Sequence, residues 1–445
     1  MNEIEPRLVA AGLLPAEARR KRELFAEVDA ALRSLAGESV PTRRWFVPGR
    51  IEVLGKHTDY AGGRSLLCAV GRGFCVGAAP RRDSMVRVAD AGRGLSTEVP
   101  LDSALDRSGP GWTVYVRTVA ARAAANFPGL RGMDVAFASD LPRASGMSSS
   151  SALVVAIFTA LADWNDLPSR AEWTANIRDA EDLGGYLGAL ENGRPFGSLG
   201  GDRGVGTYGG SEDQTAILCS RAGEIRQYAF GPVRRERSMP LEEDWSFVVA
   251  SSGVVADKTG TARESYNRLS LAAAEILDVW NRSTGNRDPT LFSSLAGGPD
   301  VPERIRGLLR AFPPAGWASD FLVGRLDQFI EETFVLVPRA GDLLEKGETG
   351  LLGETVDRSQ ALAERCLGNQ VPETVALARS ARDLGAVAAS AFGGGFGGSV
   401  WAITRTEDAD SFRRRWAESY ARAFPAATES SRFFLTRPGP AVVRL

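Results

Sequence analysis

The chain has 445 residues, of which 44% are hydrophobic and 24% are charged, and its formal net charge at pH 7 is -2. This length favours two or three domains that share a cleft, and the ordinary composition indicates a globular protein with a substantial core. The nearly balanced charge argues against a polyanionic partner, so nucleic-acid binding is disfavoured.

The cysteines and the N-terminus indicate the cellular compartment. Four cysteines are scattered along the chain without the short paired spacing of a zinc site or a redox dithiol, so we expect buried free thiols. Glu3 and Glu5 stand where a signal peptide would carry positive charge. No stretch approaches the roughly 20 apolar residues of a membrane span. The sequence predicts a cytoplasmic protein with no membrane contact.

Hydrophobic periodicity predicts the main elements in chain order. Residues 15–35 are amphipathic with helical spacing, whereas residues 45–53 and 65–76 have the pattern of strands. An apolar helix is expected over residues 153–161. A strand is expected over residues 247–250, and a strand-like run over residues 387–403 is interrupted by a block of glycines.

A glycine-rich segment separates the two halves of the chain. Residues 193–210 hold eight glycines in eighteen positions, which excludes a regular helix or strand and predicts a mobile loop. The character of the sequence changes after Ser220. We therefore predict an N-terminal domain over residues 1–225 and a C-terminal domain over residues 226–445.

Residues 48–60 follow a predicted strand and read Pro-Gly-Arg-Ile-Glu-Val-Leu-Gly-Lys-His-Thr-Asp-Tyr. They place Arg50, the single histidine His57 and Asp59 beside glycines. This combination suits a polar ligand site, and the alternative interpretation is a solvated charged turn.

Residues 142–152 contain a run of four serines, at positions 148–151, that leads directly into the predicted apolar helix. Such a turn directs backbone N–H groups and the positive end of a helix dipole at one point. It therefore favours phosphate binding, and its hydroxyls can ligate Mg²⁺. A serine run before a helix also serves as a simple N-cap, so this segment alone leaves both interpretations open.

Two further segments combine glycine with candidate site residues. Residues 209–214, Gly-Gly-Ser-Glu-Asp-Gln, place acids after a glycine pair at the start of an apolar run, although acids are common at helix N-termini. Residues 393–398, Gly-Gly-Gly-Phe-Gly-Gly, fit a tight turn or a bulged strand as well as a ligand contact.

In this order and spacing, three of these segments resemble the signature motifs of the GHMP kinases, in particular the galactokinase-like branch. The first resembles P-G-R-x-x-x-x-G-E-H-T-D-Y-x-G-G, except that Lys56 replaces the glutamate. The second resembles P-L-G-x-G-L-S-S-S-A, with Ala144 in place of a glycine, and the third matches G-G-G-F-G-G in full. Weaker similarity covers Trp112 with Tyr115 and the segment 264–268, and the whole resemblance spans roughly residues 43–445.

The resemblance implies an α+β fold of two domains, with the active site in the cleft between them. It implies that Asp213 is the catalytic base and Arg50 its partner. The chemistry agrees, because a cation beside a carboxylate lowers the pKa of the carboxyl group and also stabilises a transferring phosphoryl group. The alternative role for Asp213 is a helix cap.

The resemblance also implies ATP and Mg²⁺ as cofactors. The implied ATP-binding residues are Gly146, Ser148, Ser149, Ser150 and Trp112. Ser150 and Glu191 are the expected Mg²⁺ ligands, and Glu181 is the alternative to Glu191 because the glycine-rich segment lengthens the spacing to Asp213. Oxygen ligands suit Mg²⁺ better than a transition metal.

The implied sugar-binding residues are Lys56, His57, Asp59, Gly210 and Tyr266. Lys56 is the informative departure, because lysine donates hydrogen bonds and cannot accept one. Either its side chain turns away, pairing with an acid such as Glu52 or Glu212, or the site prefers an acceptor-rich sugar such as a uronic acid.

The leading functional prediction is ATP-dependent phosphorylation of galactose, or of a galactose-like sugar, at the anomeric hydroxyl. Alternatives within the class are kinases for galacturonate, N-acetylgalactosamine or arabinose. An alternative outside it is a catalytically silent sensor of sugar and ATP, which loss of the acid or of the serines would favour. The expected partners are the sugar and ATP, and the expected assembly is a monomer or a weak homodimer.

Overall fold

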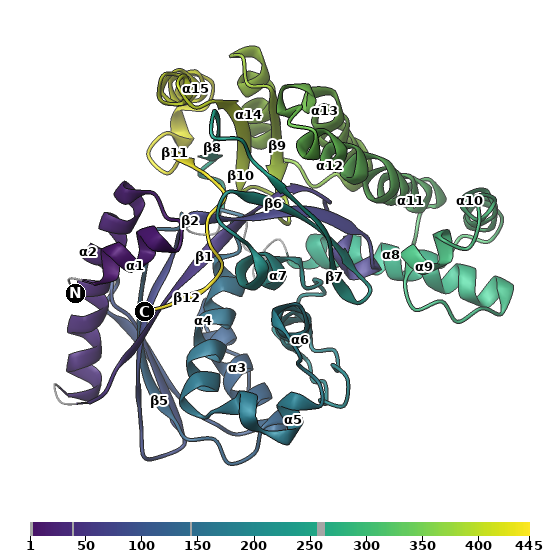
Figure 1. The fold of residues 1–445 in the computed structure, drawn as a ribbon. Helices are drawn as coiled ribbons and strands as arrows, with labels where there is room; N and C mark the ends of the chain where they lie inside the picture. The colour runs from purple at the N-terminus through teal and green to yellow at the C-terminus, as the bar shows by residue number, and fades with distance from the viewer. Residues whose placement is uncertain (1–2, 38–39, 143–144, 256–262) are drawn as a thin grey trace.

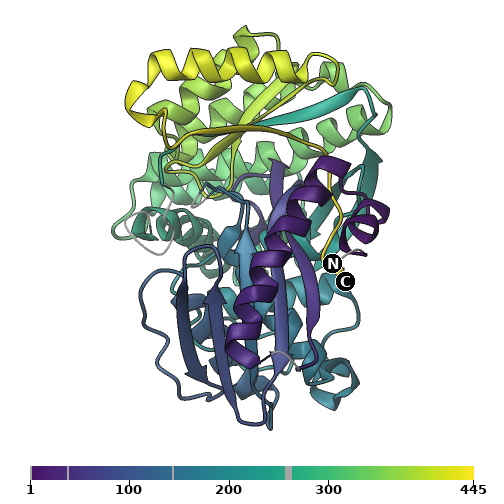
Figure 2. The ribbon, with the colours of Figure 1, turned by 90° about the vertical axis from the view of Figure 1, so that its left-hand side faces the viewer.

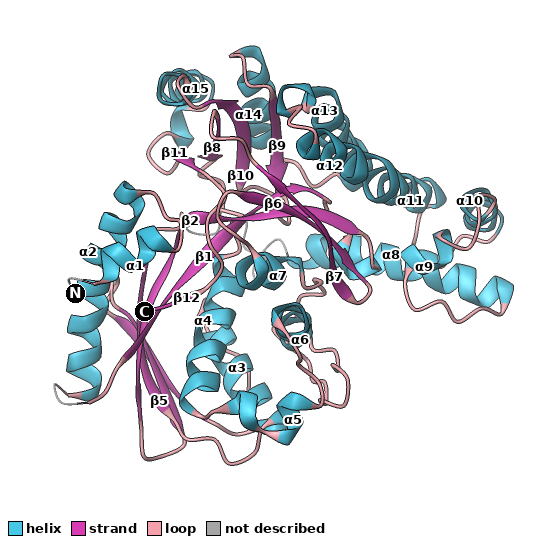
Figure 3. Cartoon of the chain, viewed as in Figure 1, coloured by secondary structure: helices cyan, strands magenta, loops and turns pink. Residues whose placement is uncertain are grey.

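The computed structural model describes residues 3–37, 40–142, 145–255 and 263–445 (Figure 1). It combines two β-sheets with helices that lie mostly in separate layers, which confirms the predicted α+β class (Figure 3). Among the described residues no helix is long and apolar enough to span a membrane. The four cysteines are free, as expected, and all except the half-buried Cys366 are buried.

The larger sheet has eight strands in the order β12-β1-β2-β5-β3-β4, and β6 and β7 extend it from β2. All of its pairs are antiparallel except the parallel pair β3 and β5. The strands are β1 (Arg43–Leu54), β2 (Arg64–Pro80), β3 (Met85–Asp90), β4 (Leu95–Pro100), β5 (Met133–Ser139), β6 (Glu224–Phe230), β7 (Val233–Pro240) and β12 (Val443–Arg444).

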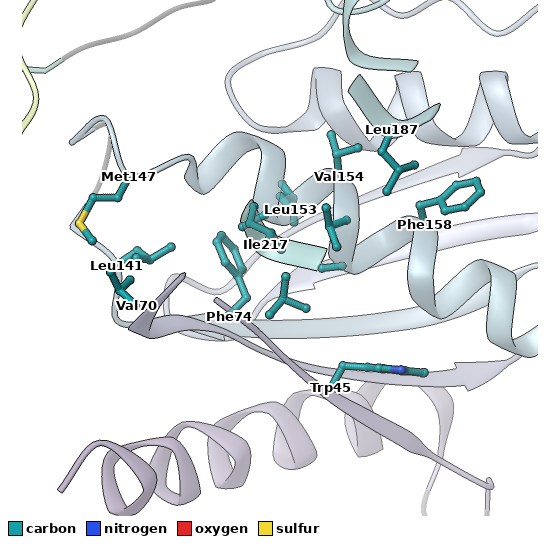
Figure 4. Packing of buried hydrophobic residues seen from close by; sticks show 14 of the residues in the cluster. Trp45, Val70, Phe74, Leu141, Met147, Leu153, Val154, Phe158, Leu187 and Ile217 are labelled. Carbon is teal, nitrogen blue, oxygen red and sulfur yellow. The ribbon is translucent and has the colours of Figure 1, made fainter. Parts of the chain in front are cut away.

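Alternation along the strands gives the larger sheet two buried faces. Trp45 joins the main core, whereas its neighbour Phe46 packs against α2 (Pro15–Ala36) on the opposite face. The main core lies between the sheet and α3 (Thr113–Asn126), α4 (Ser149–Trp164) and α6 (Ala180–Asn192). Figure 4 shows Leu153 and Val154 of α4 in this core. The helices predicted over residues 15–35 and 153–161 are confirmed.

The smaller sheet has four antiparallel strands in the order β11-β8-β10-β9. Its strands are β8 (Trp245–Ser251), β9 (Ala388–Phe392), β10 (Ser399–Arg405) and β11 (Arg432–Thr436). One face packs on α14 (Pro372–Asp383) and α15 (Ala409–Ala423), which Figure 2 shows at the top of the molecule. The other face joins the main core through Phe247 and Trp401. A single core therefore joins the two sheets.

A helical layer flanks both sheets and has a smaller core of its own. That core is formed by α8 (Arg263–Thr284), α9 (Leu291–Leu295), α10 (Val301–Ala311) and α11 (Ser319–Glu331), with the π-helical turn η3 (Glu332–Leu336) packed against it. The layer continues with α12 (Val337–Glu345) and α13 (Gly353–Leu362), which pack into the main core, and a second π-helical turn η5 (Ala363–Leu367). The remaining helices are α1 (Ile4–Ala10), α5 (Ala171–Thr174) and α7 (Glu212–Cys219).

The strands expected over residues 45–53, 65–76 and 247–250 are present, and the run 387–403 divides into β9 and β10 on either side of its glycines. The glycine-rich segment contains no helix and one isolated bridge, between Phe196 and Leu199. Its mobility stays a prediction, as does the domain boundary near residue 225. The chain passes from the larger sheet to the smaller one after this predicted boundary, between Pro240 and Trp245, because β6 and β7 still belong to the larger sheet.

Candidate active site

A small polar pocket lies where β1, the N-terminal ends of α4, α7 and α8, the glycine-rich segment and the glycine block meet. The larger sheet contributes β1, and the smaller sheet contributes only the glycine block that connects β9 to β10. Its lining consists of Arg50, Glu52, His57, Asp59, Tyr60, Ser151, Glu191, Asn192, Thr207, Gly209, Gly210, Glu212, Asp213, Gln214, Tyr266, Gly393 and Gly394.

Arg50 and Asp213 form an ion pair in this pocket. Nε of Arg50 donates to Oδ1 of Asp213 at 2.8 Å, and Nη2 lies 2.6 Å from the same oxygen. The Arg50 side chain is 1% exposed. Burial by itself lowers the pKa of Arg50, but the carboxylates of Asp213 and Glu212 raise it above its ordinary value. The guanidinium therefore stays charged. The structure brings the predicted base and its predicted partner together.

Ser151 connects Asp213 with Glu191. Its hydroxyl lies 2.9 Å from Oε2 of Glu191 and 3.3 Å from Oδ2 of Asp213. Gln214 donates to the same Glu191 oxygen at 2.6 Å. Ser151 was not among the predicted site residues, because it is the fourth member of a serine run whose first three match the family motif.

Glu191 and its alternative Glu181 lie at opposite ends of α6. Glu191 reaches the pocket, whereas Glu181 accepts a hydrogen bond from the backbone N–H of Arg235. Ten residues of helix separate the two backbones by about 15 Å. The position of Glu191 therefore suits the metal role better, although the role itself stays a prediction.

The turn after β1 presents His57 and Asp59 to the pocket. His57 lies in the left-handed region at φ 58°, and its ring nitrogens lie 3.1 Å from the Tyr60 hydroxyl and 3.2 Å from the Gly394 carbonyl. Asp59 Oδ2 accepts from the backbone N–H of Glu212 at 3.1 Å. Position 210 must be glycine, because a Cβ there would lie 2.2 Å from that oxygen. His57, Asp59 and Gly210 thus meet as the sequence predicted.

Tyr266 reaches the pocket from α8 and is 9% exposed. Its ring lies 5.5 Å from the His57 ring. The neighbouring Asn267 fastens the end of the glycine-rich segment, because its side chain bonds the backbone of Tyr208 and of Gly206. The glycine-rich segment therefore forms one wall of the pocket.

A larger cleft of about 840 Å³ opens next to the serine run. Its lining includes the predicted ATP-binding residues Trp112, Gly146, Ser148, Ser149 and Ser150. This volume lies in the usual range for a small-molecule site, and aromatic side chains form part of the wall.

Two features of this cleft fit a phosphate group. Ser148 is the N-cap of α4, so the positive end of the helix dipole faces the cleft. The Ser148 hydroxyl is buried without a hydrogen-bond partner among the described residues, so it can donate to a ligand. Ala144, the residue that departs from the serine motif, lies outside the described residues.

The donors near the serine run also suit Mg²⁺. Glu191, Asp213 and the serine hydroxyls provide oxygen ligands only. Within the described ranges no group of three or more His, Cys, Asp or Glu side chains could hold a metal. Oxygen donors of this kind, one or two carboxylates beside hydroxyls, are those that Mg²⁺ takes when substrate phosphates supply the other ligands.

Lys56 is the one predicted sugar-binding residue that lies outside the lining of the pocket. Its side chain is buried and donates through Nζ to the Ser359 hydroxyl at 2.8 Å. Ser359 in turn donates to Oε1 of Glu332 at 2.9 Å. Lys56 therefore points toward α13 and η3, and its hydrogen-bond partner is Ser359 instead of Glu52 or Glu212.

Glu52 and Glu212 line the pocket, although the sequence singled out neither as a ligand contact. Burial raises the pKa of Glu52 despite the nearby charges of Arg50 and Lys56. Burial, followed by the carboxylates of Glu52 and Asp59, raises the pKa of Glu212 well above its ordinary value. Alternation along β1 could have assigned Glu52 to a buried face, but it could not have identified Glu212 as its neighbour.

Three family models match the chain. The GHMP kinases N terminal domain matches residues 114–193, the galactokinase galactose-binding signature matches residues 31–80, and the GHMP kinases C terminal model matches residues 342–422.

Known proteins and structures agree with these matches. Galactokinases of Roseiflexus sp. (strain RS-1) and Chloroflexus aggregans are each 27% identical to the chain, over 380 and 392 residues. These alignments cover 84% and 86% of this chain and 86% and 88% of the relatives. The structure of Lactococcus lactis galactokinase complexed with galactose aligns with a TM-score of 0.76 at 20% identity. That alignment covers 95% of this chain and 100% of the other, and it shows a shared fold.

Proposed function

Because the chain belongs to the GHMP kinases, we propose that it is a sugar kinase that transfers the terminal phosphate of ATP to the anomeric hydroxyl of galactose or of a galactose-like sugar. The observation that carries this proposal is the position of Asp213. Its carboxylate lies in the wall of the polar pocket and within hydrogen-bond distance of Ser151, next to the serines that line the larger cleft.

Phosphoryl transfer requires in-line positioning, neutralisation of phosphate charge and an acceptor for the hydroxyl proton. We assign proton acceptance to Asp213, because a sugar in the pocket would meet its carboxylate. Arg50 holds that carboxylate through two of its nitrogens and supplies a fixed positive charge beside the transferring group. The backbone N–H groups at the start of α4 would hold the phosphates, together with the Ser148 hydroxyl.

Mg²⁺, when bound, neutralises charge on the phosphate oxygens. We assign Ser150 and Glu191 to hold it. Ser151 and Gln214 keep the Glu191 carboxylate in place by donating to its Oε2 atom. His57, Asp59, Gly210 and Tyr266 are assigned to orient the sugar, since a hydroxyl-rich ligand needs several convergent donors and acceptors.

The test is ADP release from ATP and Mg²⁺ with a panel of galactose, galacturonate, galactosamine, N-acetylgalactosamine and arabinose. We expect sugar-dependent turnover with galactose or a close analogue. The matched variants are Asp213→Asn, expected to be inactive, and Asp410→Asn, an exposed control on α15 expected to behave like the parent. Binding of ATP and sugar without turnover in the parent would instead identify a silent sensor.

A further inference from the structure

We propose that Glu52 is a specificity-determining residue of the sugar pocket: its carboxyl group accepts a hydrogen bond from a hydroxyl or amino group of the substrate and excludes sugars that place a carboxylate there. This inference rests on the proposed sugar-kinase function and deepens it. It identifies which side chain supplies the acceptor that the family motif has at position 56.

The backbone of Glu52 is fixed from both sheets. In the larger sheet it pairs with Leu67 of β2, directly before an irregularity in the register. From the smaller sheet, the indole N–H of Trp401 donates to the Glu52 carbonyl at 3.2 Å. A side chain on such a rigid support meets a ligand in a defined geometry, which is what discrimination between similar sugars requires.

The carboxyl group of Glu52 has unused acceptor capacity. Its Oε1 atom is buried and has no hydrogen-bond partner among the described residues. The carboxyl group of Glu212 is its acidic neighbour in the pocket lining. Two neighbouring buried carboxyl groups resist ionising together, so one of them favours the protonated form and the pair keeps lone pairs for a ligand. The raised pKa of both groups supports this protonation state.

Glu212, in contrast, already forms hydrogen bonds with other residues of the protein. Its Oε2 atom accepts from the Ser65 hydroxyl at 2.8 Å, and its backbone N–H donates to Asp59. Glu212 therefore connects Glu52 with a predicted sugar contact, and the next residue is the predicted base, Asp213. Glu52 is the member of the pair that remains available to the pocket.

The orientation of Lys56 explains why the hydrogen-bond acceptor for the sugar would be at position 52 instead of position 56. The family glutamate at that position is replaced by a cation that points out of the pocket toward Ser359. From there its charge still stabilises ionised Glu52. A carboxylate four residues earlier in the chain thus takes over the acceptor role, and the buried lysine partly offsets its charge.

The charge of the lining excludes an anionic sugar. Its acids are Glu52, Asp59, Glu191, Glu212 and Asp213. The arginine that faces them, Arg50, is already paired with Asp213. A uronic acid would bring a further carboxylate toward these acids, and Lys56 does not line the pocket to receive it.

The experiment compares the parent, Glu52→Gln and the exposed control Glu354→Gln by ADP release with galactose, galactosamine and galacturonate. Glutamine keeps the size of the side chain but replaces the charged acceptor with an amide. We expect the parent to use galacturonate at least tenfold less efficiently than galactose. In Glu52→Gln, KM for galactose should rise roughly ten- to hundredfold with little change in kcat, the worth of one hydrogen bond to a charged group. The disadvantage of galacturonate should shrink by about tenfold.

Two results would overturn the inference: a parent that prefers galacturonate, or a folded Glu52→Gln variant with unchanged KM and unchanged discrimination. Thermal unfolding of each variant establishes that it is folded. If Glu52→Gln does not fold, the parent still decides between the sugars, because exclusion of galacturonate is a property of the unaltered pocket. Failure of the proposed function looks different, because the parent would then turn over none of the sugars.

Discussion

Replacing Lys56 with glutamate, the residue of the family motif, separates the two possible roles of this side chain. In the structure Lys56 is 1% exposed and its Nζ atom bonds Ser359, which bonds Glu332. Oε2 of Glu332 is itself buried without a hydrogen-bond partner in the described part of the chain. The substitution would remove the buried cation and add a carboxylate beside this acid.

The expected loss of stability follows from the need of a buried charge for a partner. Breaking a buried charge interaction by removing one partner typically lowers the free energy of unfolding by about 3–5 kcal/mol. At about 2–4 °C per kcal/mol for a cooperative unit of roughly 150–250 residues, the melting temperature should fall by about 6–20 °C.

Calorimetry of the parent and of Lys56→Glu measures this loss, and sugar kinetics are recorded on the same samples below the transition. Lys346→Glu is the matched control, because Lys346 is exposed at the end of α12, and it should change the melting temperature little. If Lys56→Glu melted with the parent and used galactose better, Lys56 would have to reach the sugar, and the reasoning from its burial would be refuted.

Three further predictions concern the other site residues. Asp213→Asn should lower kcat by about 10²–10⁴-fold while calorimetric ATP binding persists, and a near-normal kcat would remove it from proton transfer. Ser150→Ala should raise the ATP and Mg²⁺ concentrations needed for half-maximal rate together, by roughly fivefold, whereas unchanged kinetics would leave Ser150 as part of a helix start. Burial, followed by the carboxylates of Glu52 and Asp59, raises the pKa of Glu212, so this group holds its proton more tightly when folded than when unfolded. Stability should therefore fall as pH rises above about 4.5, by about 1.4 kcal/mol per pH unit until the folded group ionises, and Glu212→Gln should remove this slope in melting temperature against pH.

The helices and strands that were predicted correctly are those in which the hydrophobic periodicity of the sequence matches the burial of the side chains. The helix at residues 15–35 packs its apolar side chains on one face of the larger sheet. Successive side chains of the strand at residues 45–53 point alternately into the two cores on either side of that sheet. The predicted strands did not include the charged segment 234–244. It forms most of β7, which pairs only with β6, so many of its side chains remain outside the core.

The candidate site was predictable where a motif keeps its members together. Arg50 of β1 and the residues His57 and Asp59 of the turn after it belong to one motif, and the family resemblance implied the pairing of Arg50 with Asp213. Ser151 was missed because position in a serine run does not say which hydroxyl faces which carboxylate. That choice depends on the rotation of α4 relative to α6, which sequence spacing does not determine.

The acids around Lys56 show why substrate preference could not be predicted from position 56 alone. Within the motif, lysine in place of glutamate reads as a change of ligand preference, and it pointed toward an anionic sugar. In the fold Lys56 lies outside the pocket lining and Glu52 lies within it, so we infer the opposite preference from the same substitution. Glu212, which is 160 residues away from Glu52 in the sequence, becomes its acidic neighbour only in three dimensions. The effect of the Lys56 charge on substrate preference therefore depends on the charges of Glu52 and Glu212. All three residues should be changed together when the specificity of this pocket is altered.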